Sequence, residues 1–282
     1  MFLQTIFDDC GIPVRRYEEV HGGDINKAFC LFTDACKYFL KVNDAALYSG
    51  MFEREAEGLN TLRENGPLKI PQVIKHGVTG KHQYLLLEWI ENERPMAYTW
   101  ENFGTGLARM HKQHQSFYGW EHDNYIGRLP QCNDKHNNWS EFYTRCRIIP
   151  LAIQLYNDGA FNSSDIKATE NFCSRLGELF PGEQPSLLHG DLWGGNYIIT
   201  TRGEPVLIDP AVYCGHREMD IGMTKLFGGF DQRFYEAYNE NYPLEKGWQK
   251  RLPLTQVYPL LVHAVLFGGH YVHKAVEVMS SI

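Results

Sequence analysis

The chain has no run of lysines or arginines, no C-x-x-C pair and no apolar stretch of membrane-spanning length. Its 27 Lys and Arg stand against 34 Asp and Glu, and the resulting net charge of -7 argues against a nucleic-acid partner. The seven scattered cysteines indicate reduced thiols and a cytoplasmic protein. Residues 1–13 contain no basic segment, so we expect no secretory signal and no membrane association.

The most informative segment runs from His189 to Asn196 and is followed by an apolar run that ends in Asp209. Phosphoryl transfer from ATP needs a carboxylate to accept the proton of the attacking hydroxyl, and oxygen ligands for Mg²⁺. Protein kinases supply them with an Asp, an Asn five residues later and a second Asp after the next strand. We therefore predict Asp191 as the base and Asn196 and Asp209 as Mg²⁺ ligands. A tight turn before a hairpin is the simpler alternative.

Lys41 lies within the apolar segment 39–42, which we expect to form a strand. A lysine in such a strand needs a partner, because an unpaired buried charge is costly. Its ammonium could hold ATP phosphates, with Glu55 in the following helix as counter-ion. Glu53 and Glu57 are alternatives to Glu55, and Lys41 could instead extend along the surface into solvent.

Gly22 and Gly23 precede that strand. Glycines allow backbone N–H groups to approach phosphate oxygens, although a Gly pair is also common in ordinary hairpin turns. We name both as nucleotide-binding candidates. No G-x-x-x-x-G-K-[ST] sequence is present, so nothing supports a P-loop NTPase.

The hydrophobic patterning indicates a small β-rich N-lobe and a larger helical C-lobe. The order of glycine turn, strand lysine, helix glutamate, apolar strand, hinge, Asp191 loop and Asp209 is what an α+β, bilobal, protein-kinase-like fold requires. We place the N-lobe at residues 1–90, a polar hinge that ends in proline at 91–95, and the C-lobe at 96–282. Strands are expected within 20–32, over 37–42 and over 84–90, and a hairpin over 197–208. Helices are expected over 51–65, 100–111, 140–157, 165–180 and 258–279.

Adenine should lie where the strand over 84–90 ends. Kinase hinges bind the base through backbone groups, so the sequence identifies this site by position alone. We expect main-chain contacts from Glu88 and Ile90.

The chain closely resembles the fructosamine (ketosamine) kinase family, within the aminoglycoside-phosphotransferase-like branch of the kinase fold. The similarity covers nearly the whole length. The segments that carry it are Gly22–Asn26, Phe52–Leu59, Asp123–Gly127, Trp139–Phe142, His189–Asn196, Asp209–Tyr213, Gly215–Asp220, Leu226–Phe230 and Leu266–Gly269.

The resemblance implies ATP- and Mg²⁺-dependent phosphorylation of the 3-hydroxyl of a ketosamine, such as fructoselysine or ribuloselysine, free or protein-bound. In that family the 3-phosphate makes the adduct unstable, so the amine is released and the protein is deglycated. Some members carry a cysteine in the glycine turn that links two subunits. Residues 23–25 contain none, so we expect a monomer or a weak dimer.

Several residues are candidates for contact with the substrate. Trp193 and Trp139 could form an aromatic wall for the sugar or the amine, although core packing is the usual role of tryptophan. Tyr213, His216 and Glu218 lie in a polar segment that could line the same pocket.

Two other functions remain open at this point. The chain could phosphorylate another small hydroxyl compound, such as an aminoglycoside or an amino alcohol; the family-specific segments weigh against this. It could also be an ATP-binding pseudokinase, but Lys41, Asp191 and Asp209 are all present.

Overall fold

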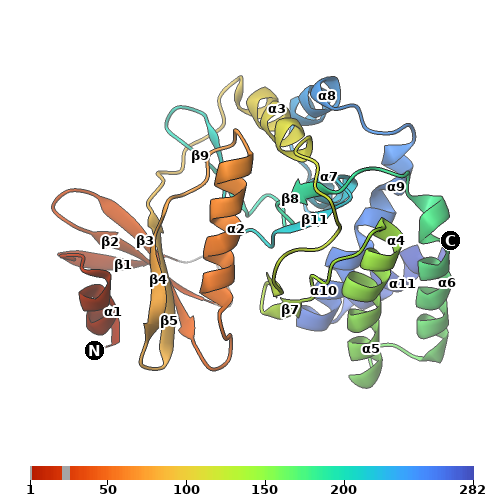
Figure 1. The fold of residues 1–282 in the computed structure, drawn as a ribbon, viewed down its shortest axis with the longest axis horizontal. Coiled ribbons are helices and arrows are strands. Elements are labelled where there is room, and N and C mark those ends of the chain that lie inside the picture. Colours follow the sequence, from red (N-terminus) through yellow and green to blue (C-terminus); the bar gives the residue numbers. More distant parts are fainter. Residues whose placement is uncertain (1, 21–25) are drawn as a thin grey trace.

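The computed structural model of the chain describes residues 2–20 and 26–282. It shows a β-rich part, formed by the first strands with helices α1 and α2, beside a larger helical part (Figure 1). This arrangement confirms the predicted α+β, bilobal fold.

The N-terminal part is built on an antiparallel sheet with the strand order β1-β2-β3-β5-β4. Successive side chains of a strand point to opposite faces, and both faces of this sheet are covered. On β5, Tyr84 and Leu86 pack with α1, whereas Leu85 and Leu87 pack with α2. The elements are α1 (Phe2–Cys10), β1 (Arg16–Val20), β2 (Lys27–Phe32), β3 (Lys37–Asp44), α2 (Met51–Asn65), β4 (Val73–Thr79) and β5 (His82–Glu88).

The same alternation determines the direction of Lys41. Its neighbours Leu40 and Val42 on β3 belong to the core on the α1 side, so Lys41 projects toward α2. Helix α2 covers that face with Phe52, Ala56 and further apolar residues. Strand alternation and helix position therefore bring the buried lysine toward Glu55.

Beyond residues 89–98 the chain is mainly helical. Its helices are α3 (Thr99–His111), α4 (Trp139–Phe142), a π-helical stretch (Tyr143–Ile148), α5 (Ile149–Asn157), α6 (Ser163–Leu179), α7 (Glu218–Leu226), α8 (Gln232–Asn241), α9 (Trp248–Thr255), α10 (Val257–Phe267) and α11 (His270–Ser280). None of the helices in residues 2–20 and 26–282 is both long and apolar enough to cross a membrane.

Within residues 124–215 the chain also forms three short antiparallel strand pairs. They are β6 with β7 (Asn124–Ile126, Leu129–Gln131), β8 with β11 (Ser186–Leu188, Tyr213–Gly215) and β9 with β10 (Tyr197–Ile199, Pro205–Leu207). Figure 1 shows β8 and β11 in the middle of the molecule, beside α7. Strand β8 leads into the Asp191 loop, and β10 leads into Asp209. The pairs that contain these two strands therefore fix the positions at which both loops start.

One predicted helix is wrong in its continuity. The expected helix over 258–279 is two helices, α10 and α11, separated at Gly268 and Gly269. Both glycines have positive φ, 65° and 63°, in a conformation that ends α10 and that other residues rarely adopt. The predicted helix over 140–157 is continuous but contains the π-helical stretch.

Helices α3 and α8 approach so closely that only glycine fits at position 104. A Cβ added to Gly104 would lie 2.1 Å from the carbonyl oxygen of Phe234. We expect Gly104→Ala to reduce the free energy of unfolding by about 1–3 kcal/mol, since the helices must separate to accept the methyl group. Denaturant-induced unfolding measures this change.

Gly177→Ala in α6 is the matched control. Its Cβ would meet only the hydroxyl oxygen of Ser140, at 3.6 Å. This substitution should leave stability unchanged or raise it by about 0.4–1 kcal/mol, because alanine restricts the unfolded chain. Equal effects of the two substitutions would contradict the close-packing argument.

Candidate active site

The ammonium of Lys41 joins three elements that are distant in sequence. Its Nζ lies 2.7 Å from Glu55 Oε1 on α2 and 2.6 Å from Asp209 Oδ1 after β10. Lys41 and Glu55 are almost fully buried, whereas the Asp209 side chain is 43% exposed. Glu55 is therefore the carboxylate that faces Lys41, and the helix does not offer Glu53 or Glu57 in its place, since both contact Arg54.

The charges of this trio depend on one another. Burial alone would lower the pKa of Lys41, but Asp209 and Glu55 raise it above its ordinary value, so the ammonium stays protonated. Burial also raises the pKa of Glu55, against the opposing effect of Lys41. Lys41 thus keeps its charge at a buried position because it is paired with two carboxylates.

Asp191, Asn196 and Asp209 meet at the start of the β9–β10 hairpin. Asn196 Nδ2 donates to the backbone oxygen and to Oδ2 of Asp191, both at 2.9 Å, and lies 3.5 Å from the Asp209 carbonyl. The Ile208 N–H donates to the Asn196 carbonyl at 3.1 Å, which closes the hairpin over the loop. The three predicted residues are therefore brought together.

A buried carboxylate binds the backbone of the Asp191 loop. Asp220 on α7 accepts hydrogen bonds from the N–H groups of His189 and Gly190, at 2.8 and 2.9 Å. His111 Nε2 lies 3.2 Å from the same carboxylate. The loop geometry that presents Asp191 is thus set by α7.

His189 orients the loop instead of acting as a base. Its Nε2 donates to the Ile208 carbonyl at 2.9 Å, and its Nδ1 accepts from the Asp191 N–H at 3.3 Å. Burial lowers the pKa of His189, so the ring stays neutral and both its nitrogens are occupied by the backbone.

The surroundings of Asp191 change the pKa of its carboxyl group. Burial raises the pKa of Asp191 to about 7, opposed by the hydrogen bond from Asn196 and reinforced by the charges of Asp209 and Asp220. A carboxyl group with a pKa near neutrality suits a base that takes a proton and then releases it.

A cleft of about 360 Å³ lies over these residues. Lys41, Glu55, Asp191, Asn196 and Asp209 all line it. The rest of the lining includes residues to which the sequence analysis gave no role in the site. Some of them lie within the segments that carry the family resemblance: Asn26, Arg54, Asn124, Tyr125, Met219 and Phe267. Others lie outside those segments: Met51, Arg128, Met223, Tyr258 and His263.

Two of the predicted substrate residues line the cleft and three do not. Trp193 and Tyr213 are part of its wall. Trp139 is a core residue, stacked on Tyr143 at 4.8 Å between ring centroids. His216 and Glu218 are almost fully buried and are not among the residues that line the cleft, so the structure does not support the prediction that they contact substrate.

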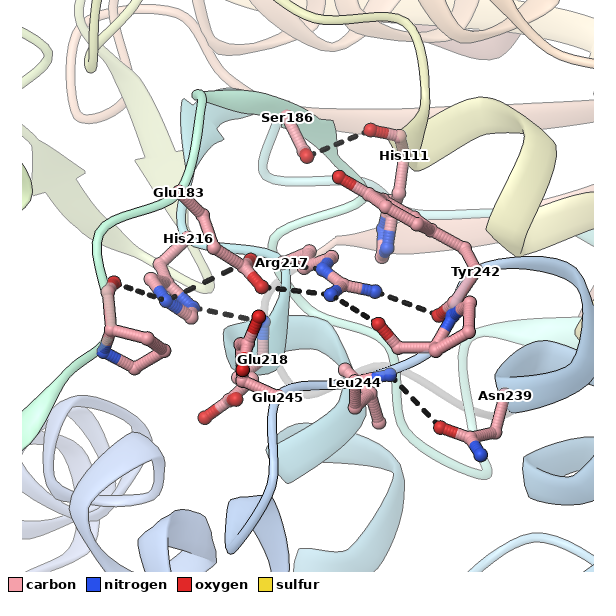
Figure 2. Close-up of polar contacts among 12 residues, drawn as sticks. His111, Glu183, Ser186, His216, Arg217, Glu218, Asn239, Tyr242, Leu244 and Glu245 are labelled. Atoms are coloured by element: carbon pink, nitrogen blue, oxygen red, sulfur yellow. Dashed lines mark hydrogen bonds and ion pairs between the residues drawn. The ribbon is translucent and has the colours of Figure 1, made fainter.

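His216 and Glu218 belong to a buried polar cluster at the start of α7 (Figure 2). Arg217 makes a bidentate pair with Glu183, at 2.9 and 2.7 Å, and donates to the Tyr242 carbonyl. His216 Nε2 lies 3.8 Å from Glu183 Oε2. The polar side chains of this cluster therefore bind to partners inside the protein.

Glu218 is bound in the same cluster by Arg251 of α9, through two contacts of 2.8 and 2.5 Å. Polar sequence alone could not distinguish such a buried ion pair from a pocket lining, because the partner is 33 residues away.

The nucleotide-binding predictions at the N-lobe fare differently. Gly22 and Gly23 lie outside the described residues. The Glu88 N–H donates to the Gln72 carbonyl at 2.8 Å, and its carboxylate lies 3.7 Å from Lys69 Nζ. Glu88 and Ile90 are not among the cleft residues, so their contacts with adenine stay a prediction.

Fold and site together define a phosphotransferase of the protein-kinase-like class. An aminoglycoside phosphotransferase superposes over 99% of this chain with a TM-score of 0.65 at 14% identity, which is a likeness of fold. A candidate fructosamine-3-kinase from Thermobifida fusca superposes over 97% of this chain and 95% of its own, with a TM-score of 0.88 and 34% identity.

The sequence comparisons identify the family. The family model described as fructosamine kinase matches residues 5–282, and the chain belongs to this family. A probable ketoamine kinase of Synechocystis is 39% identical, covering 98% of this chain and 94% of its own. A chloroplastic protein-ribulosamine 3-kinase of rice is 37% identical over 92% of this chain and 76% of its own. The chain is accordingly an ATP-using phosphotransferase that acts on an alcohol group.

The position of Glu218 makes a testable difference. We expect Glu218→Ala to reduce the free energy of unfolding by roughly 3–5 kcal/mol, since it leaves the guanidinium of Arg251 without its counter-charge. Thermal and denaturant unfolding check this, with exposed Glu240→Ala on α8 as control. Unchanged stability with a raised KM for the acceptor would instead place Glu218 in the substrate site.

Proposed function

We propose that this protein transfers the γ-phosphoryl group of ATP to the 3-hydroxyl of a ketosamine, which leads to release of the amine. The observation that carries the proposal is the convergence of Lys41, Asp191 and Asp209 on one cleft of a fructosamine kinase family member. Relatives named ketoamine kinase and protein-ribulosamine 3-kinase support this class of acceptor.

Asp191 is proposed as the base. Its carboxylate would accept the proton of the attacking hydroxyl, while Asn196, which donates to Asp191 Oδ2, fixes its orientation. Lys41 would contact the α- and β-phosphates, with Glu55 holding the ammonium in place. Little covalent work is required of the protein, so positioning and charge stabilisation carry the rate.

The oxygen donors near Asp191 fit a magnesium ion. Within the described residues, Asn196 Oδ1 and Asp209 Oδ2 accept no hydrogen bond, so both oxygens are available as ligands. The described residues contain no group of three or more His, Cys, Asp or Glu that could hold a metal by themselves. This suits Mg²⁺, which protein sites commonly bind through one or two side chains together with phosphates and water. Bound there, Mg²⁺ would neutralise charge on the transferred group.

Partly exposed rings beside the cleft suit an acceptor that extends out of it. Trp193 packs edge-on against Phe227, at 5.8 Å between centroids, and Phe227 lies 4.9 Å from the ring of His263. Trp193 and Phe227 are each 37% exposed. We propose that the sugar lies near Asp191 and the amine substituent, free or protein-bound, passes over these rings.

A cytoplasmic location is part of the proposal. Each of the seven cysteines is a free thiol, which fits a reducing compartment.

The first experiment is a Mg·ATP-dependent assay on ribuloselysine, fructoselysine, an aminoglycoside and choline. We expect turnover of the ketosamines. Asp191→Ala should lose at least about 10²–10³-fold in kcat, as expected when one strong electrostatic partner is lost at a reacting centre. Product analysis should locate the phosphate on the 3-oxygen.

The assay also separates the other functions. Turnover of the aminoglycoside or choline but of neither ketosamine would replace the proposed acceptor. Binding of ATP without turnover of any compound would favour a pseudokinase.

The pH dependence of the reaction reports on Asp191. A base acts in its ionised form, so kcat/KM for the ketosamine should fall as pH drops through the pKa, which is about 7 for Asp191. A nearby cation favours the carboxylate, so raising the Mg²⁺ concentration should move this limb to lower pH. A flat profile between pH 5 and 8 at low Mg²⁺ would contradict the assignment of the base.

A further inference from the structure

The backbone just after β10 is held in an uncommon conformation. Asp209 has φ of 53°, in the left-handed region, and it is the one non-glycine with positive φ in residues 2–20 and 26–282. Such a conformation persists only when the surroundings determine it. Two and three residues further on, the backbone carbonyls are bound by side chains: Ala211 accepts from Gln131 Nε2 at 3.2 Å and Val212 from Asn124 Nδ2 at 2.8 Å.

Behind Asn124 a chain of hydrogen bonds leads to a buried arginine. Arg147 Nη2 donates to Asn133 Oδ1 at 2.7 Å, and Asn133 Nδ2 donates to Asn124 Oδ1 at 2.9 Å. Asn124 Nδ2 then donates to the Val212 carbonyl. We call this series, Arg147–Asn133–Asn124–Val212, the amide relay.

The two ends of the amide relay determine the orientation of both amides. A guanidinium can only donate, and a backbone carbonyl can only accept. Asn133 must therefore turn its oxygen toward Arg147 and its nitrogen toward Asn124, and Asn124 must turn its nitrogen toward Val212. Gln131 reinforces this order: its Nε2 donates to Asn124 Oδ1 at 2.7 Å, while its Oε1 accepts from the Tyr258 hydroxyl at 2.7 Å.

Arg147 is an unusual choice for a purely structural position. It is fully buried, and no carboxylate in the described residues pairs with it. Its guanidinium lies over the rings of Tyr213 and Tyr258, 4.2 and 5.3 Å from their centroids, and both rings line the cleft. Burying a cation without a counter-charge reduces the stability of the folded protein. This loss of stability indicates that Arg147 has a role in the cleft beside it.

We propose that Arg147 is a positioning residue for phosphoryl transfer. Through the amide relay it fixes the Val212 carbonyl and, with it, the left-handed turn that directs the Asp209 carboxylate toward the metal. This inference depends on the proposed function, because it assigns Asp209 to Mg²⁺. It also gives a role to Asn124, which lies in the family-specific segment Asp123–Gly127.

Asn133→Asp tests the relay without removing its volume. The new carboxylate still accepts from Arg147 and supplies the missing counter-charge. It cannot donate to Asn124 or to the His122 carbonyl, and its oxygen faces both of these acceptors. Repulsion between these oxygens favours rotation of the Asn124 amide, which the hydrogen bond from Gln131 Nε2 opposes, and the hold on the Val212 carbonyl is weakened.

The expected result separates stability from metal binding. Asn133→Asp should keep a Tm close to that of the wild type, because the new ion pair with Arg147 offsets the hydrogen bonds lost at Asn124 and His122. The Mg²⁺ concentration needed for half-maximal binding of a non-hydrolysable ATP analogue, measured by calorimetric titration, should rise 10–100-fold, as for other groups that orient metal ligands. Binding of the analogue without Mg²⁺ should not change, kcat should fall, and KM for the ketosamine should stay within about threefold of the wild-type value.

Two further variants complete the test. Asn137→Asp makes the same chemical change four residues on, at an exposed position, and should behave as wild type. Gln131→Glu still accepts from the Tyr258 hydroxyl but loses the donor to the Ala211 carbonyl and to Asn124 Oδ1. It should also raise the Mg²⁺ requirement, and it provides the test if Asn133→Asp does not fold.

Native stability with an unchanged Mg²⁺ requirement in Asn133→Asp would overturn the proposal. Parallel losses of stability and activity in both relay variants would also overturn it, by assigning the network to folding alone. Failure of the proposed function has a different signature: the wild-type protein would bind the analogue with Mg²⁺ and phosphorylate no ketosamine, while the metal requirement of the variants still reports on the relay.

Discussion

The buried ammonium of Lys41 is the constraint on which the rest of the structure depends. A charge in this position must be paired, and its two carboxylate partners come from α2 and from a residue 168 positions later in the chain. Satisfying one lysine thus requires that the sheet, α2 and the end of β10 meet at one point. The cleft is the space left around this meeting point, so the charge balance that permits burial also places the reacting groups.

The larger part of the molecule repeats this logic with polar groups in its interior. Asp220 holds the Asp191 loop, the pairs of Arg217 and Glu218 hold the start of α7, and Arg147 orients the amides behind Asp209. Breaking such contacts is more costly than never having them, so they favour one arrangement of the loops over many similar ones. An apolar core would give stability without this choice.

The sequence predicted well those features that depend on short-range order. The helix over 51–65, the pairing of Lys41 with Glu55 and the grouping of Asp191, Asn196 and Asp209 follow from helix periodicity, the need to pair a buried charge and fixed spacing. The fates of Trp139, His216 and Glu218 were not predictable in this way, because burial of a polar or aromatic residue depends on partners far along the chain. The break at Gly268 was missed because an apolar pattern continues across it, while the backbone conformation changes.

The amides behind Asp209 carry a chemical liability. Asparagine and glutamine side chains are thermolabile, and slow hydrolysis turns the donating NH₂ group into an oxygen that only accepts. At an exposed position this hydrolysis would only add a negative charge. In the amide relay it would replace a required hydrogen-bond donor with an acceptor. Asn133 and Gln131 are only 2% and 1% exposed, which shields them from water. The dry packing of the β6–β7 region therefore also bears on the protein's working lifetime.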